Sequence, residues 1–360
     1  MNPKKYLQQC QGLRGLTFLC IFASHLFRIN AWGAWGVSVF LVLSGFLMAY
    51  NYLDRTEETH FGIGFACRKL RRLYGLHVLI LAGYAAAGLL GFYQGFHGIH
   101  DLLSKTVLHT GLIQTWVPYM PYYYSLNDVS WYLCACAFAY ACFGPVVRHL
   151  RRVMRVGRVW LYVAGIVCLQ FCAAAFSYLF LNPDAAGPFS IHWLTYVCPA
   201  SRFLEFLAGC CLGWLYLNRN RAQNRSAAVW LDITAICATV ASWAVYTYRI
   251  WPLGIQCMKY AFLFSIPSML VVYAVSGDGF LNRLLRMRIL VRIGDLSPYG
   301  FLMHGAMIGV CRYLLALAGI TGIWAVTTGS VTLTFVASVL WERLPGRKRG
   351  QPWLEEVPGR

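Results

Sequence analysis

Ten long apolar segments recur along this 360-residue chain, and they constrain its fold more than any other feature. Each has roughly 17 to 24 residues, which at about 1.5 Å per residue lets one helix cross a hydrocarbon core about 30 Å thick. They occupy approximately residues 13–29, 33–53, 73–92, 130–147, 159–181, 194–217, 229–248, 253–275, 296–317 and 322–341. The sequence therefore predicts an all-α integral membrane protein, a bundle of about ten transmembrane helices.

The low content of charged residues supports this prediction. Only 12% of the residues are charged, whereas soluble proteins have about a quarter. The first apolar segment does not resemble a cleavable signal peptide, because Arg14 interrupts its start and nine further segments follow it. We therefore expect the amino-terminal segment to remain as the first span.

The distribution of lysine and arginine predicts the topology. Of the 31 cationic residues, 24 fall in alternate loops or near the two ends of the chain, whereas the opposite loops hold only Lys105 and Arg249. Cationic loops face the cytoplasm in membrane proteins, so both termini are expected there. The net charge of +18 then points to anionic membrane lipid rather than to nucleic acid as a partner.

No linker or repeat divides the sequence. We interpret residues 1–345 as a single transmembrane domain and residues 346–360 as a short basic cytoplasmic tail. The 14 cysteines lie mostly in apolar segments and form no CxxC pair, so neither a zinc site nor a disulfide framework is expected.

The longest predicted connection, residues 93–129, is rich in aromatic side chains. Tyrosines and a tryptophan at 116–124 precede Asn127 and Asp128, a composition that suits stacking on a sugar and hydrogen bonding to it. The same composition is typical of an aromatic belt at the membrane interface. The sequence leaves both interpretations open.

Ionisable residues within the spans are the candidates for function, since each is costly in a bilayer. Arg14 and His25 are eleven residues apart, close to three helical turns, so they share one face at an axial separation of about 16 Å. A donor with a phosphate-rich head and a distant reactive group, such as coenzyme A, would place its phosphates near Arg14. His25 can act as a base on an acceptor hydroxyl, or it can be a buried hydrogen-bonding residue.

Other polar residues admit two interpretations each. Arg68, Arg71 and Arg72 can bind the phosphates of coenzyme A or serve only as a topology signal. Arg202 and Glu205, three residues apart, can form a structural ion pair or a substrate clamp.

His304, Asp232, Lys259 and Arg312 complete the set of candidates. His304 can be a core residue or a second catalytic group, and Pro298 before it is expected at a helix start. Asp232 is expected to complement the positive amino end of its own helix. Lys259 and Arg312 receive no role.

Several motifs, in order along nearly the whole chain, resemble the acyltransferase 3 family of membrane O-acyltransferases. The first is GLRGLTFLCIFASH (12–25), which is similar to that family's signature of an arginine, ten residues and a histidine. GVSVFLVLSGFL (36–47), with Ser44, resembles the second-span motif, and CRKLRRLY (67–74) resembles the arginine-rich third motif. The later matches are SLNDVSWYLCA (125–135), RFLEFLAG (202–209), IGDLSPYGFLMH (293–304) and WERLP (341–345). The sequence departs from the usual pattern at Ser38, Gly75, Cys136 and Pro298.

The resemblance implies a ten-span, multi-pass enzyme of the plasma membrane or bacterial inner membrane. Such an enzyme O-acylates a carbohydrate or a lipid-linked glycan of the cell envelope, with acetyl-CoA or a related acyl-CoA as donor and no metal. It implies catalytic roles for His25, Arg14, Glu205 and His304. His25 would remove a proton from the acceptor hydroxyl or accept the acyl group transiently, and Glu205 and His304 would orient the acceptor or the base. It also implies that Arg14 and the cluster Arg68, Arg71 and Arg72 bind the donor. Ser44, Asn127, Trp131 and Arg202 would then contact substrate.

Two other classes of function compete with this prediction. A glycolipid transporter or flippase would use the same buried charges along a translocation path and would show an inverted repeat, which the sequence lacks. A sensor or scaffold would keep the fold without the chemistry.

Overall fold

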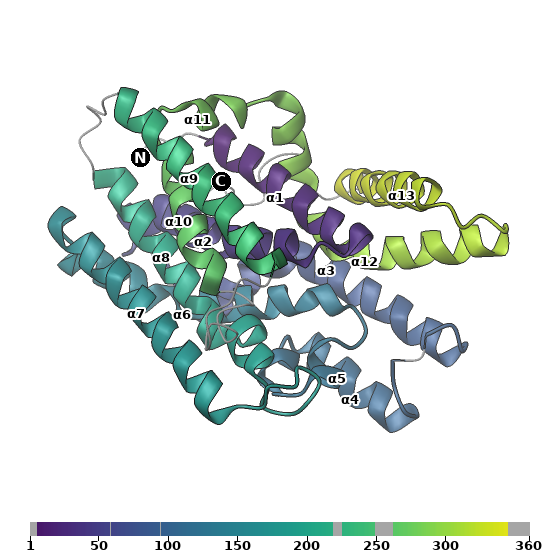
Figure 1. The fold of residues 1–360 in the computed structure, drawn as a ribbon. Coiled ribbons are helices and arrows are strands. Elements are labelled where there is room, and N and C mark those ends of the chain that lie inside the picture. Colours follow the sequence, from purple (N-terminus) through teal and green to yellow (C-terminus); the bar gives the residue numbers. More distant parts are fainter. Residues whose placement is uncertain (1–5, 58, 94, 219–224, 249–261, 345–360) are drawn as a thin grey trace.

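The structure, a computed structural model, describes residues 6–57, 59–93, 95–218, 225–248 and 262–344, and these residues fold into a bundle of helices (Figure 1). The α-helices are α1 (Gln8–Phe27), α2 (Asn30–Tyr52), α3 (Ile63–Leu89), α4 (Ile99–Thr110), α5 (Met120–Tyr123), α6 (Trp131–Val153), α7 (Val156–Phe180), α8 (Pro199–Asn218), α9 (Arg225–Tyr248), α10 (Phe262–Val275), α11 (Phe280–Leu284), α12 (Arg288–Leu317) and α13 (Ile323–Arg343). The short turns η1 (Leu53–Arg55), η2 (Gln114–Trp116) and η3 (Asp128–Ser130) are 3-10 helices, and η4 (Trp193–Val197) is a π-helix. The predicted all-α class is confirmed for this part of the chain.

Each of the ten predicted spans overlaps one long helix of the bundle, although the start of the span 253–275 lies outside the described residues. Seven helical segments are long and apolar enough to cross a membrane, and they include α2, α3, α6, α7, α9, α12 and α13. Helices α1 and α8 are not among them, and both carry polar residues along their 20-residue length. The structure thus supports a multi-pass membrane protein with seven clear spans among the described residues, and the predicted count of ten stays a prediction.

Close backbone contacts fix two helix pairs at the centre of the bundle. Helix α2 crosses α8 where a β-carbon at Gly45 would overlap the carbonyl oxygen of Phe206. Helix α1 crosses α12 in the same way, since a β-carbon at Gly15 would overlap the carbonyl oxygen of Leu290. Small residues let helices in membranes approach this closely. The glycines of the first two sequence motifs therefore set the positions of Arg14 and Ser44.

One predicted helix start is wrong, and one helix begins well before its predicted span. Helix α12 begins at Arg288, so Pro298 lies inside this helix rather than at its start. Helix α3 begins at Ile63, ten residues before the predicted span, and the arginine cluster 68–72 is therefore helical. In both cases the amphipathic turns before the apolar segment continue the helix, and hydrophobicity alone does not detect them.

The segment between α3 and α6 is compact. It contains α4, η2, α5 and η3, and His109 of α4 lies at its centre, fully buried. One ring nitrogen of His109 lies 3.2 Å from Ser130 Oγ, and the other lies 3.0 Å from both the Tyr122 carbonyl oxygen and Ser125 Oγ. Burial lowers the pKa of His109 to about 4. This neutral histidine holds the segment against the end of the bundle.

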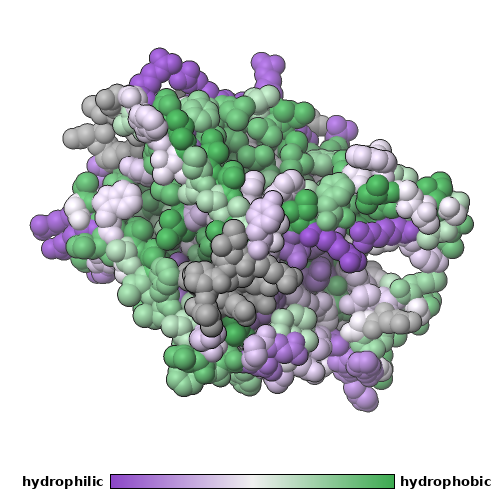
Figure 2. Space-filling view, viewed as in Figure 1, coloured by the Kyte–Doolittle hydropathy of each residue, from purple (hydrophilic) through white to green (hydrophobic). Residues whose placement is uncertain are grey.

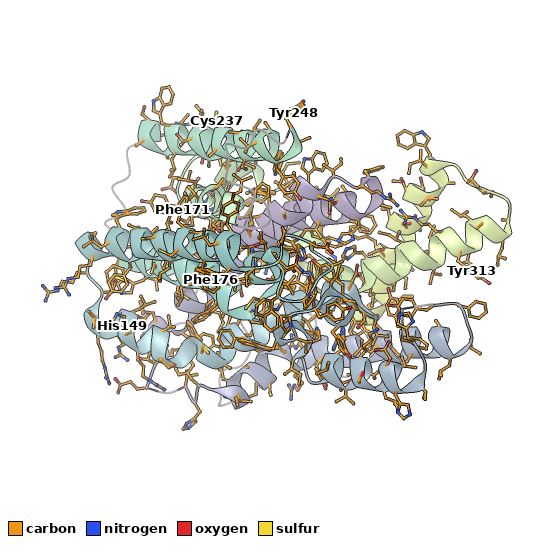
Figure 3. All side chains as sticks on the ribbon, turned by 60° about the horizontal axis from the view of Figure 1, so that its bottom comes forward. His149, Phe171, Phe176, Cys237, Tyr248 and Tyr313 are labelled. Atoms are coloured by element: carbon orange, nitrogen blue, oxygen red, sulfur yellow. The ribbon has the colours of Figure 1, made fainter. Side chains whose placement is uncertain are left out.

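The outer surface is largely apolar. Figure 2 shows a mostly hydrophobic face with hydrophilic residues gathered at its edges and beside a hollow under the lobe that α12 and α13 form. Phe171 and Phe176 of α7 and Tyr313 of α12 project from the outer faces of their helices (Figure 3), and about half of each side chain is exposed. An apolar exterior of this kind suits hydrocarbon rather than water.

Candidate active site

His25 and His304, both predicted from the sequence, lie together. Their rings meet edge to face with centroids 4.7 Å apart, at the end of α1 and in the middle of α12. Nδ1 of His304 lies 2.7 Å from the Phe301 carbonyl oxygen, and because a carbonyl only accepts, Nδ1 donates this hydrogen bond. Nε2 of a neutral His304 is therefore an acceptor. Two imidazolium ions at this separation would repel strongly, so the pair accommodates one positive charge at most.

His25 opens into a polar cavity of about 310 Å³. Asp128 faces the same cavity, and the two side chains interact electrostatically. From the sequence, Asp128 is predicted only as one of the polar residues that suit hydrogen bonding to a sugar, although its position beside Asn127 in the fourth motif was a signal for a closer role. Side chains of several elements complete the lining: Ile21, Ser24, Asn30, Gly33, Ala34, Val37, Tyr124, Val129, Trp131, His192, Tyr196, Tyr246 and Phe301.

We call this the polar cavity. Aromatic side chains form one of its walls. His192 lies 3.1 Å from the hydroxyl of Tyr123 and 3.4 Å from that of Tyr124 through its two ring nitrogens. Burial lowers the pKa of His192 to about 4, so this ring is neutral near pH 7. Trp131, one of the predicted substrate contacts, also lines the cavity. Aromatic faces beside hydroxyl groups and a carboxylate provide stacking and hydrogen bonds of the kind that a sugar requires.

Arg14 lines a separate cavity of about 50 Å³, which is largely apolar. Lys69 is the second cationic residue that lines this cavity. Ser44, predicted as a substrate contact, also lines it, and the Ser44 hydroxyl lies 2.9 Å from the hydroxyl of Tyr140. The remaining lining residues are Phe40, Leu43, Leu47, Met48, Asn51, Leu70, Leu73, Tyr132, Leu133, Cys136, Pro298, Phe301 and Leu302. We call this the apolar cavity.

One side chain, Phe301, lines both cavities. Its ring centroid lies 5.2 Å from that of Tyr132 and 6.0 Å from that of Phe40. The sequence predicts that Arg14 and His25 share one helix face along a single long donor. In the structure the two residues line different cavities, and the Phe301 ring stands between them.

The structure distinguishes the members of the cationic cluster. Arg68 and Arg71 are exposed, and Arg68 donates a hydrogen bond of 2.8 Å to the His60 carbonyl oxygen. Lys69 lies in the predicted cationic segment but is not one of its named arginines, and it is the member that reaches the apolar cavity. Its spacing of four residues from Leu73, on the face of α3 that packs inward, was the signal that could have identified it.

Arg202 and Glu205 lie apart from both cavities. They form a fully buried ion pair of 2.9 Å on α8, and Ser265 donates a 2.7 Å hydrogen bond to Glu205. The guanidinium group lies over the rings of Trp131 and Tyr196, with centroid distances of 5.8 and 5.6 Å. Of their two possible roles, the geometry favours the structural ion pair. Trp131 and Tyr196 line the polar cavity, so the ion pair supports the wall of this cavity from behind without lining it.

Two other candidates have structural contacts. Asn127 is buried and donates a 3.2 Å hydrogen bond to the Leu302 carbonyl oxygen, which ties η3 to α12. Asp232 accepts a 3.0 Å hydrogen bond from the Leu281 amide, so it caps α11 rather than the amino end of its own helix as predicted. Lys259 lies outside the described residues. The described residues contain no group of three His, Cys, Asp or Glu side chains that could hold a metal ion.

Comparison with known proteins adds independent information. A family model described as an acyltransferase domain matches residues 8–342, nearly the whole chain. The acyltransferase MdmB of Streptomyces mycarofaciens is 26% identical over 325 residues, which cover 83% of this chain and 78% of that protein. No solved structure matches the chain.

Proposed function

The chain belongs to the acyltransferase 3 family of membrane proteins, and from this premise we propose that it moves an acetyl group from cytoplasmic acetyl-CoA to a hydroxyl group of a carbohydrate or lipid-linked glycan. The observation that carries the proposal is the pair of cavities that meet at Phe301. One is apolar and cationic at Arg14, whereas the other is polar and aromatic at His25.

The apolar cavity fits the donor. Asn51 and Lys69 line it at the end of the bundle that the charge distribution predicts to be cytoplasmic. Its cations can bind phosphate or polarise a carbonyl oxygen, and its apolar walls suit the slender arm of coenzyme A. Arg14 would then lie beside the thioester end of the donor and Lys69 nearer to its phosphates.

The polar cavity fits the acceptor. A sugar hydroxyl beside His25 would lose its proton to the imidazole as its oxygen attacks the thioester carbon. The new C–O bond forms, the C–S bond breaks, and the thiolate of coenzyme A leaves with the proton that His25 releases. Asp128 would stabilise the imidazolium, and His304 would hold the ring in position. The protein would be returned to its starting state.

The Phe301 ring imposes one condition on this chemistry. The acetyl group bound near Arg14 must pass the ring to reach His25, since the ring lines both cavities. The expected site of the enzyme is a plasma membrane or bacterial inner membrane, where donor and acceptor approach from opposite faces.

Transfer of radiolabel tests the proposal. Purified protein in lipid nanodiscs is incubated with [14C]acetyl-CoA and a crude glycolipid extract, and labelled acceptor is separated by chromatography. We expect transfer by the wild type and a rate lower by about a hundredfold or more in His25→Ala. The exposed His100→Ala, a matched control on α4, should retain transfer. A folded wild type that releases no coenzyme A and labels no acceptor would refute the proposed acyl transfer. Movement of glycolipid across the membrane without acetyl labelling would favour a transporter.

A further inference from the structure

A third cavity adjoins the polar cavity and also ends at His25. It has a volume of about 310 Å³ and shares His25, Tyr124 and Asp128 with its neighbour. Its other lining residues come from α3, the segment that follows it, and α12: Tyr84, Tyr93, Leu126, Gly305, Ile308, Gly309 and Arg312. We call it the lateral cavity. A molecule that fills it would touch the catalytic histidine.

One face of α12 leaves this space open. Gly305, Gly309 and Arg312 recur at intervals of four and three residues, so they lie on one side of the helix. A β-carbon at Gly309 would meet no atom within 4 Å, and one at Gly305 would meet Asp128 at 3.5 Å. Larger residues at these positions would fill the cavity. The two glycines therefore create room beside Arg312.

The polar groups of the lateral cavity favour an anion at its mouth. Arg312 is exposed to the cavity, and no carboxylate among the described residues lies within ion-pair distance of it. Guanidinium binds phosphate in a bidentate manner, and the tyrosine hydroxyls of Tyr84 and Tyr93 can contribute further hydrogen bonds. Asp128 lies deeper, beside His25, where it would repel an anion. A bound phosphate would therefore remain near Arg312.

The helices that flank this cavity have exposed apolar side chains on their outer faces. Leu89 and Leu90 at the end of α3 are 66% and 71% exposed, and Leu317 of α12 is 70% exposed. The rings of Phe92 and Tyr313 meet at 5.8 Å and connect the outer ends of the two helices. The cavity therefore lies between two helices with apolar outer surfaces. A ligand with a long hydrocarbon chain could keep that chain in the bilayer.

We propose that the lateral cavity binds the phosphate of a lipid-linked acceptor, with Arg312 as its counter-ion and the space between α3 and α12 as its entrance from the membrane. This proposal rests on the proposed function, and it specifies the acceptor as an anionic lipid rather than a free sugar. The phosphate at Arg312 would place the attached sugar toward Asp128 and His25. The aromatic wall of the polar cavity would then contact that sugar.

Photo-crosslinking tests this proposal. The protein is reconstituted in nanodiscs of zwitterionic phosphatidylcholine and labelled with an alkyl phosphate that carries a diazirine. We expect label on the peptide that contains Arg312, a decrease of about tenfold or more in Arg312→Gln, and no decrease in Arg288→Gln, an exposed arginine at the other end of the same helix. Gly309→Leu, which fills the cavity without removing charge, should also prevent labelling.

The competitors distinguish the sources of phosphate. Unlabelled alkyl phosphate should compete, whereas inorganic phosphate and a neutral alkyl glucoside should not. Labelling of Arg312→Gln equal to that of the wild type, or equal labelling by a neutral diazirine alcohol, would overturn the proposal. Release of coenzyme A from acetyl-CoA is measured in the same samples. If labelling depends on Arg312 but acetyl-CoA is never consumed, the result supports phosphate binding in the lateral cavity and contradicts the proposed acetyl transfer.

Discussion

The imidazole rings of His25 and His304 lie edge to face with their centroids 4.7 Å apart, although the two residues come from opposite ends of the chain. The Phe301 carbonyl fixes the tautomer of His304, so its free nitrogen is an acceptor. His25, in contrast, is accessible from two cavities. This asymmetry supports our proposal that His25 transfers the proton and that His304 orients His25.

The first prediction concerns this pair. His25→Ala should lower kcat for acetyl transfer by about 10²- to 10⁴-fold, the usual contribution of a general base. His304→Phe should lower kcat less, leave KM for acetyl-CoA unchanged and alter the pH profile of kcat, because it acts through His25. Initial rates of coenzyme A release across a pH series provide the measurement. An unchanged pH profile of kcat in His304→Phe would contradict the proposal that His304 orients His25.

The second prediction separates the cations near the donor. Lys69→Gln should raise KM for acetyl-CoA by about tenfold, since Lys69 lines the apolar cavity, whereas Arg68→Gln should leave KM nearly unchanged. Arg14→Gln should affect both KM and kcat because it lies closer to the reacting end. Steady-state kinetics with acetyl-CoA as the varied substrate distinguish the three variants. Equal effects of Lys69→Gln and Arg68→Gln on KM would instead indicate that the whole cationic segment attracts acetyl-CoA without a specific contact from Lys69.

The third prediction concerns Phe301. Replacement by alanine removes the ring between the two cavities, so water from the polar cavity would reach the bound thioester. We expect Phe301→Ala to hydrolyse acetyl-CoA without an acceptor, and Phe301→Leu to do so less. Thiol release in the absence of glycolipid measures this activity. As a control, Phe171→Ala alters only an exposed ring on α7. No acceptor-independent hydrolysis by Phe301→Ala would show that the ring does not separate the substrates.

The fourth prediction concerns stability. Arg202→Met leaves the carboxylate of Glu205 buried without its partner and should destabilise the protein by about 3–5 kcal/mol. A second substitution, Glu205→Gln, should recover much of this loss because it removes the unpaired charge. Arg292→Met, which breaks the partly exposed pair with Glu342, should cost less than about 1 kcal/mol. Unfolding in detergent followed by fluorescence compares the variants. Equal losses at both pairs would contradict the assignment.

The fifth prediction concerns pH. His109 has a pKa of about 4 in the folded protein and about 6.5 when unfolded, so the unfolded state binds more protons between these values. Its contribution to stability is complete above pH 6.5 and decreases as the pH falls, by about 2 kcal/mol at pH 5. Hydrogen exchange should show residues 99–130 opening more readily at pH 5 than at pH 7.5. His109→Gln should weaken this dependence, and the exposed His100→Gln should not.

The sequence predicts the helical class and the principal site residues for a physical reason. Charged and titratable groups are rare inside apolar segments, so Arg14, His25 and His304 stand out. Spacing along one helix could not reveal Phe301, because its role arises from packing against α2 and α6. Asp128 lies in a loop whose path depends on tertiary contacts. Lys69 is indistinguishable from its cationic neighbours until the face of α3 that packs inward is known.

The glycine crossings limit which parts of the protein can move. Where Gly15 meets Leu290 and Gly45 meets Phe206, backbone lies directly on backbone, and no intervening side chain can rotate to allow sliding. Helices α1 and α12 therefore behave as one rigid body, and α2 and α8 as another. His25 and His304 belong to the first body, so their geometry persists through a reaction cycle. Any hinge that admits or releases substrate must instead involve the other helices or the segments that connect the helices.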